Sequence, residues 1–194
     1  MTNWDRSGQM TVVAPPVAPS GVIIKDLRVE LRDVYDAHAA YVWNTLRRLG
    51  ASPSDLEDLT HDVFVQVERH LAEYDPVRPM KPWLFCFAFR ILSQHRRRVR
   101  RHPESPRWAL DPVDPAPLAD QRLMIDQDRQ LVIAALGAIE QDRRAVFVLH
   151  EIDGIPMQEI ARTMGIPVNT AYSRLRVARA EFKAAVTRLR RGER

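Results

Sequence analysis

Residues 155–182 read IPMQEIARTMGIPVNTAYSRLRVARAEF, and this stretch indicates how the carboxy-terminal part of the chain folds. Two helical patterns flank the turn Gly165-Ile166-Pro167, where glycine permits the left-handed conformation that ends a helix. The second pattern has one apolar stripe with alternating spacings of three and four residues: Val168, Ala171, Leu175, Ala178 and Phe182. The stretch therefore predicts a helix-turn-helix, although an ordinary helical hairpin with a solvated basic face fits the same pattern.

Charge is segregated along the chain. The 29 Lys and Arg residues and 25 Asp and Glu residues give a net charge of only +4, so the placement of charge is more informative than its sum. Residues 90–101 contain six arginines and no acid, and residues 172–194 contain seven arginines and one lysine against two glutamates. Residues 55–62 carry four acids and no Lys or Arg. Two basic helices and one acidic helix are therefore expected.

The composition indicates a reducing compartment. Cys86 is the only cysteine, so an internal disulfide is excluded, and its aromatic neighbourhood predicts a buried, inert thiol. No apolar run approaches the roughly 20 residues that a membrane span requires, and residues 1–21 do not have the pattern of a signal peptide. We expect a cytoplasmic protein without membrane insertion.

Apolar periodicity predicts an all-α fold made of two small helical domains joined by an extended linker. A mobile tail is expected at residues 1–25, and the first domain at 26–101. Its three predicted helices cover residues 27–50, 54–71 with a capping box of Ser54 and Glu57, and a segment that opens near Pro82. The linker at 102–122 contains five prolines and four acids, and the second domain, at 123–191, adds helices over 123–139 and 143–151 before the helix-turn-helix.

Five strings carry a resemblance to a known family: DLEDLTHDVF at 55–64, PWL at 82–84, EIA at 159–161, MGIP at 164–167 and SRL at 173–175. In this order and spacing they resemble the extracytoplasmic-function (ECF) group of sigma factors, sigma-70 family subunits of bacterial RNA polymerase. The resemblance implies a non-enzymatic protein without cofactor or metal. It also implies that the helix-turn-helix reads the −35 promoter element, that the first domain binds and melts the −10 element, and that a stress or envelope response regulon is served.

The candidate −35 residues lie on the outer side of the second helix of the motif. Residues near the amino end of a recognition helix lie deepest in the major groove, so base contacts are expected from Asn169, Thr170, Tyr172, Ser173 and Arg176. Phosphate contacts are expected from Arg174, Arg179 and Lys183. A solvated helix face is the alternative interpretation of the arginines.

The candidate −10 residues combine aromatic and basic side chains. An opened strand needs a wedge, a pocket for an unstacked base and a basic track for its backbone. Trp83 and the loop containing Tyr74 and Asp75 are placed to supply the first two, although core packing is a strong alternative for Trp83. The track is expected from Arg90, Gln94, Arg97, Arg98 and Arg101, and Arg90 and Gln94 stand where the family often has Asn and Asp.

The acidic helix is the candidate polymerase-docking surface, with Asp55, Glu57, Asp58 and Asp62 facing a basic partner and Phe64 supplying apolar contact. Helix capping and solubility are the alternative explanation of these acids. The resemblance implies that this helix binds the clamp helices of the beta-prime subunit. It also implies that the beta flap, promoter DNA and an anti-sigma factor are further partners. For the linker it implies a path toward the active-site and RNA-exit channel, and flexible tethering of the two domains is the alternative.

Two other classes of protein match part of the sequence. A stand-alone helix-turn-helix transcription regulator explains residues 155–182 but gives the acidic helix and the 90–101 helix no role. A metal phosphohydrolase is suggested by His61-Asp62, but the remaining histidines do not have matching spacing, and no catalytic residue is assigned.

Overall fold

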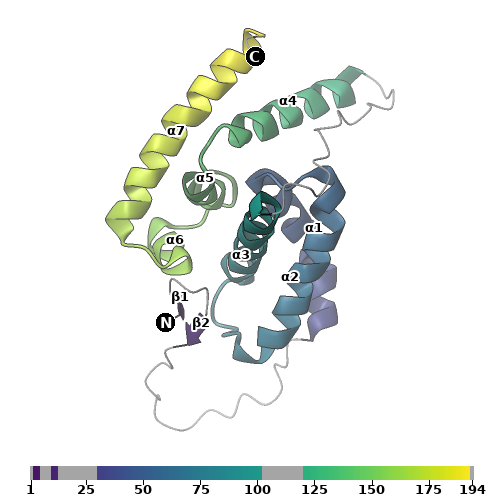
Figure 1. Ribbon diagram of the computed structural model, residues 1–194, viewed down its shortest axis with the longest axis vertical. Coiled ribbons are helices and arrows are strands. Elements are labelled where there is room, and N and C mark those ends of the chain that lie inside the picture. Colours follow the sequence, from purple (N-terminus) through teal and green to yellow (C-terminus); the bar gives the residue numbers. More distant parts are fainter. Residues whose placement is uncertain (1, 5–9, 13–29, 102–119, 193–194) are drawn as a thin grey trace.

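The computed structural model describes residues 2–4, 10–12, 30–101 and 120–192, and over these ranges the chain is helical apart from two three-residue strands (Figure 1). The predicted all-α fold is confirmed. The helices are α1 (Leu31–Leu49), α2 (Leu56–His70), α3 (Met80–Arg101), α4 (Asp120–Gly137), α5 (Gln141–Phe147), α6 (Met157–Met164) and α7 (Val168–Arg190). Short turns of other helical types are η1 (Pro53–Asp55), η2 (Leu71–Glu73) and η3 (Val148–Ile152), of which η3 is a π-helix.

The two strands, β1 (Thr2–Trp4) and β2 (Met10–Val12), pair antiparallel, with Thr2 opposite Val12. They fall within residues 1–25, for which the sequence predicts only a tail. Three residues are too few to show the alternation that identifies a strand in a sequence. The other residues of that segment, and residues 102–119 of the predicted linker, lie outside the described residues.

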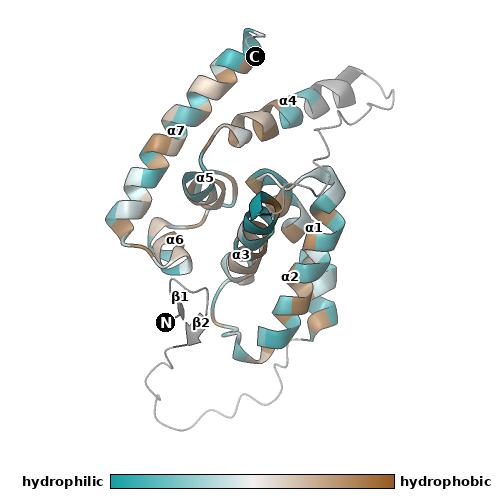
Figure 2. Cartoon of the chain, viewed as in Figure 1, coloured by the Kyte–Doolittle hydropathy of each residue, from teal (hydrophilic) through white to brown (hydrophobic). Residues whose placement is uncertain are grey.

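Helices α1, α2 and α3 pack against one another as the first module. Apolar side chains from all three are fully buried, among them Leu46, Val63 and Leu84, and Figure 2 shows the hydrophobic positions along these helices. Helix α1 ends where predicted, since Gly50 takes the left-handed conformation with φ of 90°. The predicted capping box is wrong: residues 53–55 form a turn of 3-10 helix, so that Asp55 takes the N-cap position of α2 and no side chain caps it.

Helices α4 to α7 form the second module. Helix α4 begins at Asp120, inside the predicted linker, and α5 runs into η3 where one continuous helix is predicted. Gly165 ends α6 in the left-handed conformation with φ of 62°, as the turn signal predicts. Ala171, Leu175 and Ala178 of the predicted stripe are buried, but Val168 is 36% exposed because it is the first residue of α7 and projects beyond the core.

The two modules share one hydrophobic core, and α1 contacts α4 and α5 while α3 contacts α6. Arg144 of α5 donates from Nη1 to the carbonyl oxygen of Leu49 at 2.7 Å, and Tyr41 Oη of α1 donates to Asp153 Oδ2 at 2.8 Å. The Cys86 thiol of α3 donates to the carbonyl oxygen of Thr163 at 3.3 Å. The sequence predicts two tethered domains but not this direct contact between them.

Candidate nucleic-acid interface

Helix α7 begins at Val168, directly after the turn at Gly165, so the first residues of α7 lie at a corner of the second module (Figure 1). Asn169, Tyr172, Ser173 and Arg176 are exposed and Thr170 is half-buried; Tyr172 is 53% exposed although it is a large aromatic residue. The exposure expected of base-reading residues is therefore present at all but one of the five positions. Their contact with DNA stays a prediction.

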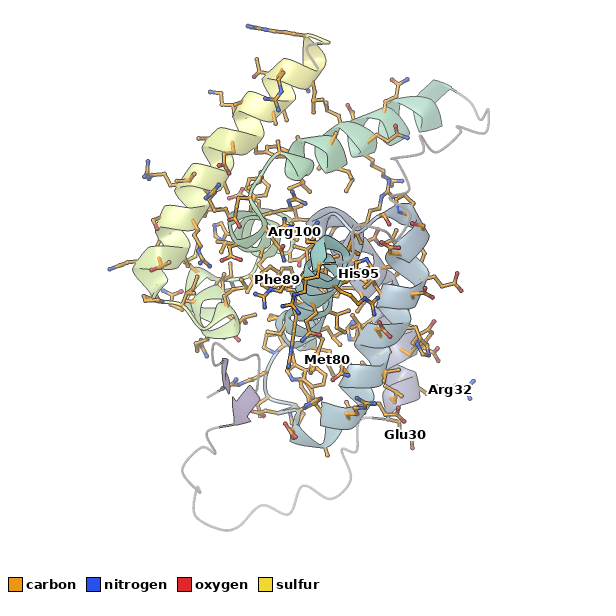
Figure 3. All side chains as sticks on the ribbon, in the orientation of Figure 1. Glu30, Arg32, Met80, Phe89, His95 and Arg100 are labelled. Carbon is orange, nitrogen blue, oxygen red and sulfur yellow. The ribbon has the colours of Figure 1, made fainter. Side chains whose placement is uncertain are left out.

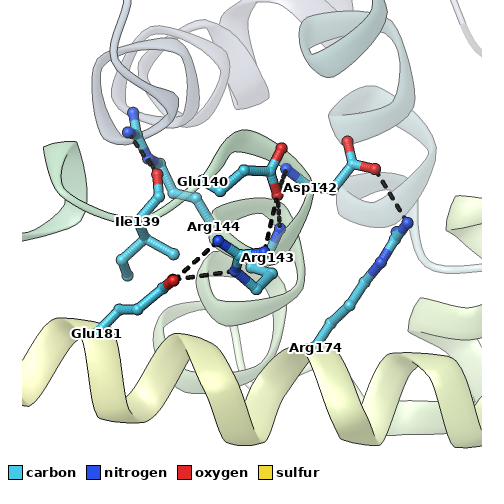
Figure 4. Close-up of polar contacts among 7 residues, drawn as sticks. All are labelled: Ile139, Glu140, Asp142, Arg143, Arg144, Arg174 and Glu181. Carbon is cyan, nitrogen blue, oxygen red and sulfur yellow. Dashed lines mark hydrogen bonds and ion pairs between the residues drawn. The ribbon is translucent and has the colours of Figure 1, made fainter.

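Ion pairs fix α7 against α5 (Figure 4). Arg143 donates from Nε and Nη2 to the two carboxylate oxygens of Glu181, at 3.0 and 2.8 Å, and this two-bond geometry fixes the rotation of α7 as well as its distance. Arg174 donates to Asp142 Oδ2 at 3.0 Å and is half-buried. Glu140 caps α5 by accepting from the backbone N–H groups of Asp142 and Arg143. Arg174, predicted to bind phosphate, thus also has a partner within the module.

The remaining basic residues of α7 differ in their surroundings. Arg179 donates from Nη2 and Nε to Glu151 Oε1, at 2.6 and 2.9 Å. Lys183 and Arg176 are exposed, and within the described ranges neither forms an ion pair. Asp142, Glu151 and Glu181 were not predicted as site residues, and no spacing signal could have identified them, because each lies 28 to 38 residues from its arginine.

An aromatic cluster lies at the amino end of α3. The ring of Trp83 is 4.9 Å from that of Tyr74 and 4.9 Å from that of Phe87, to which it is nearly perpendicular. Phe87 is buried, whereas Trp83 and Tyr74 are half-buried. The Tyr74 hydroxyl donates to the carbonyl oxygen of Arg78 at 2.5 Å, and Asp75 Oδ1 accepts from the Val77 N–H at 3.0 Å, so the loop is ordered by its own polar groups. Burial raises the pKa of Tyr74.

The basic end of α3 faces solvent. Gln94, Arg97, Arg98 and Arg101 are exposed and Arg90 is half-buried; Figure 3 labels Arg100 on the same helix. Arg96 instead turns inward, donating to the carbonyl oxygens of Leu49 and Gly50 at 2.8 Å each. Arg90, Gln94 and Arg98 share a cleft of about 470 Å³ with Asp62, Gln66 and Arg69 of α2. Candidate −10 residues and a candidate docking residue therefore meet at one surface, where sequence reasoning missed Gln66 and Arg69.

The acidic helix α2 presents Glu57, Asp58 and Asp62 to solvent. Asp55 is half-buried, and its Oδ2 lies 3.0 Å from His95 Nε2 of α3. The prediction that Phe64 offers apolar contact to a partner does not fit its position. Phe64 is only 5% exposed, and its ring lies 4.7 Å from that of Tyr35, so it packs in the core. It belongs to a wide buried face that also contains Thr60 and Val67.

Other classes of site receive no support from the described residues. No group of three His, Cys, Asp or Glu side chains among them is arranged to hold a metal ion. None of their helices is both long and apolar enough to cross a membrane.

Comparison with known proteins matches each module to a known family region. A family model of sigma-70 region 2 matches residues 34–102, and a model of sigma-70 region 4 matches residues 129–182. The ECF RNA polymerase sigma factor SigE of Mycolicibacterium smegmatis is 32% identical over 153 residues, which are 75% of this chain and 57% of SigE. The RNA polymerase sigma factor HrpL of Pseudomonas syringae pv. syringae is 30% identical over 136 residues, which are 68% of this chain and 73% of HrpL.

A solved structure has the same fold. The sigma factor RpoE from Bartonella quintana, in complex with the anti-sigma factor NepR, matches with a TM-score of 0.63 and 19% identity, over 80% of this chain and 96% of RpoE. At this identity the likeness concerns the fold alone. The two region models fall in order on the two helical modules, and HrpL is matched over most of its own length. The chain therefore belongs to the ECF group of the sigma-70 family, the non-catalytic RNA polymerase subunits that direct promoter-specific transcription initiation.

Proposed function

We propose that this sigma factor contacts the −35 element with the exposed side of α7 and the −10 element with α3 and the Tyr74 loop, while α2 docks on core polymerase. One observation supports this division most directly: basic and polar residues are exposed on two helices of different modules, and acids are exposed on a third helix. Duplex DNA and an opened strand can then be bound at separate places. DNA phosphates are repelled by the acidic surface, which leaves that surface to a basic partner.

At the −35 element, base contacts come from Asn169, Thr170, Tyr172, Ser173 and Arg176, and Lys183 contacts phosphate. Arg176 is the strongest candidate for a guanine, because its exposed guanidinium can donate two bonds to one base edge. Arg176→Ala should relax preference at one promoter position and cost about 1–3 kcal/mol. Selection from a randomised −35 library tests this, since an unchanged preference at every position removes Arg176 from base reading.

At the −10 element, the exposed guanidiniums of Arg97, Arg98 and Arg101 form the track for the strand backbone. Trp83 and Tyr74 form the wedge, since each keeps part of its ring accessible while packing on the other. Asp75 maintains the loop. Arg90 and Gln94 contact the −10 region from the cleft they share with α2.

Docking on the beta-prime clamp helices uses Glu57, Asp58 and Asp62, with Asp55 held back by His95. The experiment is co-purification of core polymerase with Asp58→Lys/Asp62→Lys. Asp33→Lys/Asp36→Lys on exposed positions of α1 is the matched charge control. Loss of core binding in the first variant alone supports the docking surface, and equal recovery of core by both variants contradicts it.

In vitro transcription tests the whole proposal. Core polymerase with this chain should initiate on members of a randomised promoter library at which core alone does not. A gel shift without polymerase tests the alternative of a stand-alone regulator, which would bind its operator unaided. We place the protein in the cytoplasm, where polymerase and promoters are, under the control of an anti-sigma factor, and the beta flap as a contact of the second module.

A further inference from the structure

One acidic side chain from outside α7 reaches into its exposed basic side. Glu151 lies in the π-helical turn η3, and its Oε1 accepts both hydrogen bonds from Arg179. The side chains of Arg179 and Glu151 are 57% and 34% exposed. Ion pairs this accessible contribute little to folding stability, so stability alone does not account for the pair.

Arg179 stands in the middle of the basic stripe. Tyr172, Arg176, Arg179 and Lys183 follow one another at spacings of four, three and four residues, which places them on one side of the helix. All four are exposed. The carboxylate of Glu151 therefore contacts the stripe at Arg179, the position that lies between Arg176 and Lys183 along the helix.

The pair presents no net charge to a phosphate. Its carboxylate and guanidinium are 2.6 Å apart, well inside the screening length of about 8 Å at physiological salt, so attraction and repulsion of a phosphate offset each other. A neutral pair does not neutralise a phosphate, so its approach releases no counterion from the DNA. Counterion release is the source of sequence-independent affinity. Arg179 in this state adds neither affinity nor salt dependence.

We propose that Glu151 sets the sequence-independent affinity of α7 for duplex DNA, by neutralising Arg179 and so withholding one phosphate contact. This inference rests on the proposed function, because it concerns α7 on DNA. Arg179, predicted from the sequence as a phosphate contact, becomes the partner of an acid instead. The free chain then binds DNA weakly, and promoter engagement depends on the base-reading residues and on polymerase.

Glu151→Gln isolates the charge, since glutamine keeps an oxygen that accepts from Arg179 but has no negative charge. The assay is fluorescence anisotropy of the full chain on a labelled non-promoter duplex, from 50 to 200 mM salt. We expect binding about three- to tenfold tighter at 50 mM salt, and a plot of log affinity against log salt steeper by about 0.9. The double variant Glu151→Gln/Arg179→Gln should behave like the parent chain, because both sites are neutral, whereas Arg179→Gln alone leaves the Glu151 carboxylate unpaired and should weaken binding.

Asp36→Asn is the matched control, because Asp36 is an exposed acid paired with Arg32 on α1, away from α7. It changes net charge equally and should not alter the salt slope. Unchanged or weaker DNA binding by Glu151→Gln overturns the proposal, as does a slope flattened by about 0.9 in the double variant relative to the parent chain, which would make Arg179 a phosphate contact already. Thermal unfolding of each variant checks that it is folded. Failure of the proposed function has a separate signature: the parent chain would not support promoter-specific transcription.

Discussion

Replacement of Arg144 by methionine tests the contact between the two modules most directly. The Arg144 side chain lies within the shared core at 7% exposure, and its guanidinium donates to the carbonyl oxygens of Leu49, Gly137 and Ile139. Figure 4 shows the bond to Ile139. Methionine preserves the aliphatic stem but removes every donor. The Leu49 oxygen keeps a bond from Arg96, and Gly137 is exposed to water, so the Ile139 oxygen suffers most.

Two opposing contributions set the size of the effect. An unsatisfied buried carbonyl costs about 1–3 kcal/mol, and the two other lost bonds about 1 kcal/mol each. Against this, burial and the nearby Arg96 charge lower the pKa of Arg144 to about 10, and removing so disfavoured a charge returns about 3 kcal/mol. The losses total about 3–5 kcal/mol, so at the centre of their range they exceed this return by about 1 kcal/mol.

Labelling of Cys86 reports this loss at the interface itself. Burial raises the pKa of the Cys86 thiol to about 12, and the thiol donates to Thr163 of the other module, so a thiolate-selective reagent reacts slowly while the modules are together. A change of about 1 kcal/mol multiplies opening of the interface by about 5, and labelling of Arg144→Met should accelerate by that factor.

Arg143→Met is the control, because Arg143 is the neighbouring arginine but pairs with Glu181 inside the second module. It should label as the parent chain does. If Arg144→Met labels no faster than Arg143→Met, the arginine does not hold the modules together and the reasoning is refuted.

Three further outcomes are expected. Gly50→Ala should destabilise the chain by at least about 1–2 kcal/mol in urea unfolding, since φ of 90° strains alanine and its Cβ would collide with Arg144 and Arg96; an unchanged midpoint contradicts this. Burial raises the pKa of Asp153, so its contribution to stability is present when it is protonated and is lost as pH rises through the folded-state pKa. Asp153→Asn should thus be as stable as the parent chain at pH 7, within about 1 kcal/mol, and its stability relative to the parent chain should fall toward pH 4, where the parent is protonated. A relative stability of Asp153→Asn that rises on acidification contradicts this. Trp83→Ala and Tyr74→Ala should each reduce permanganate reactivity of the −10 region, and normal strand opening in both refutes the wedge.

Helix positions could be predicted because period and punctuation are local properties. Gly50 and Gly165 end their helices in the left-handed conformation where the sequence places the stops. The errors have local causes too. Ser54 does not cap α2 because residues 53–55 form a turn of 3-10 helix of their own. Val168 was expected to be buried because it continues the apolar stripe, but a stripe does not show where the core ends, and Val168 lies beyond that end.

Contacts between distant residues could not be predicted in this way. An arginine such as Arg144 is normally expected at the surface. Only the packing of α5 on the end of α1 brings carbonyl oxygens around its guanidinium. Phe64 was assigned to a partner because it follows acids on α2, but the ring of Tyr35, from α1, lies against it. In both cases the deciding neighbour comes from another helix, about which periodicity carries no information.

The same limit applies to charge. Residues 172–194 are strongly basic in sequence, yet Asp142 and Glu151 pair with Arg174 and Arg179, so the positive charge of α7 in space is smaller than its composition indicates. Within residues 168–183, Arg176 and Lys183 are then the cations without an acidic partner among the described residues. Because Asn169, Tyr172 and Arg176 all lie in the first three turns of α7, the proposed −35 contact would concentrate attraction to DNA and base reading at the amino end of this helix.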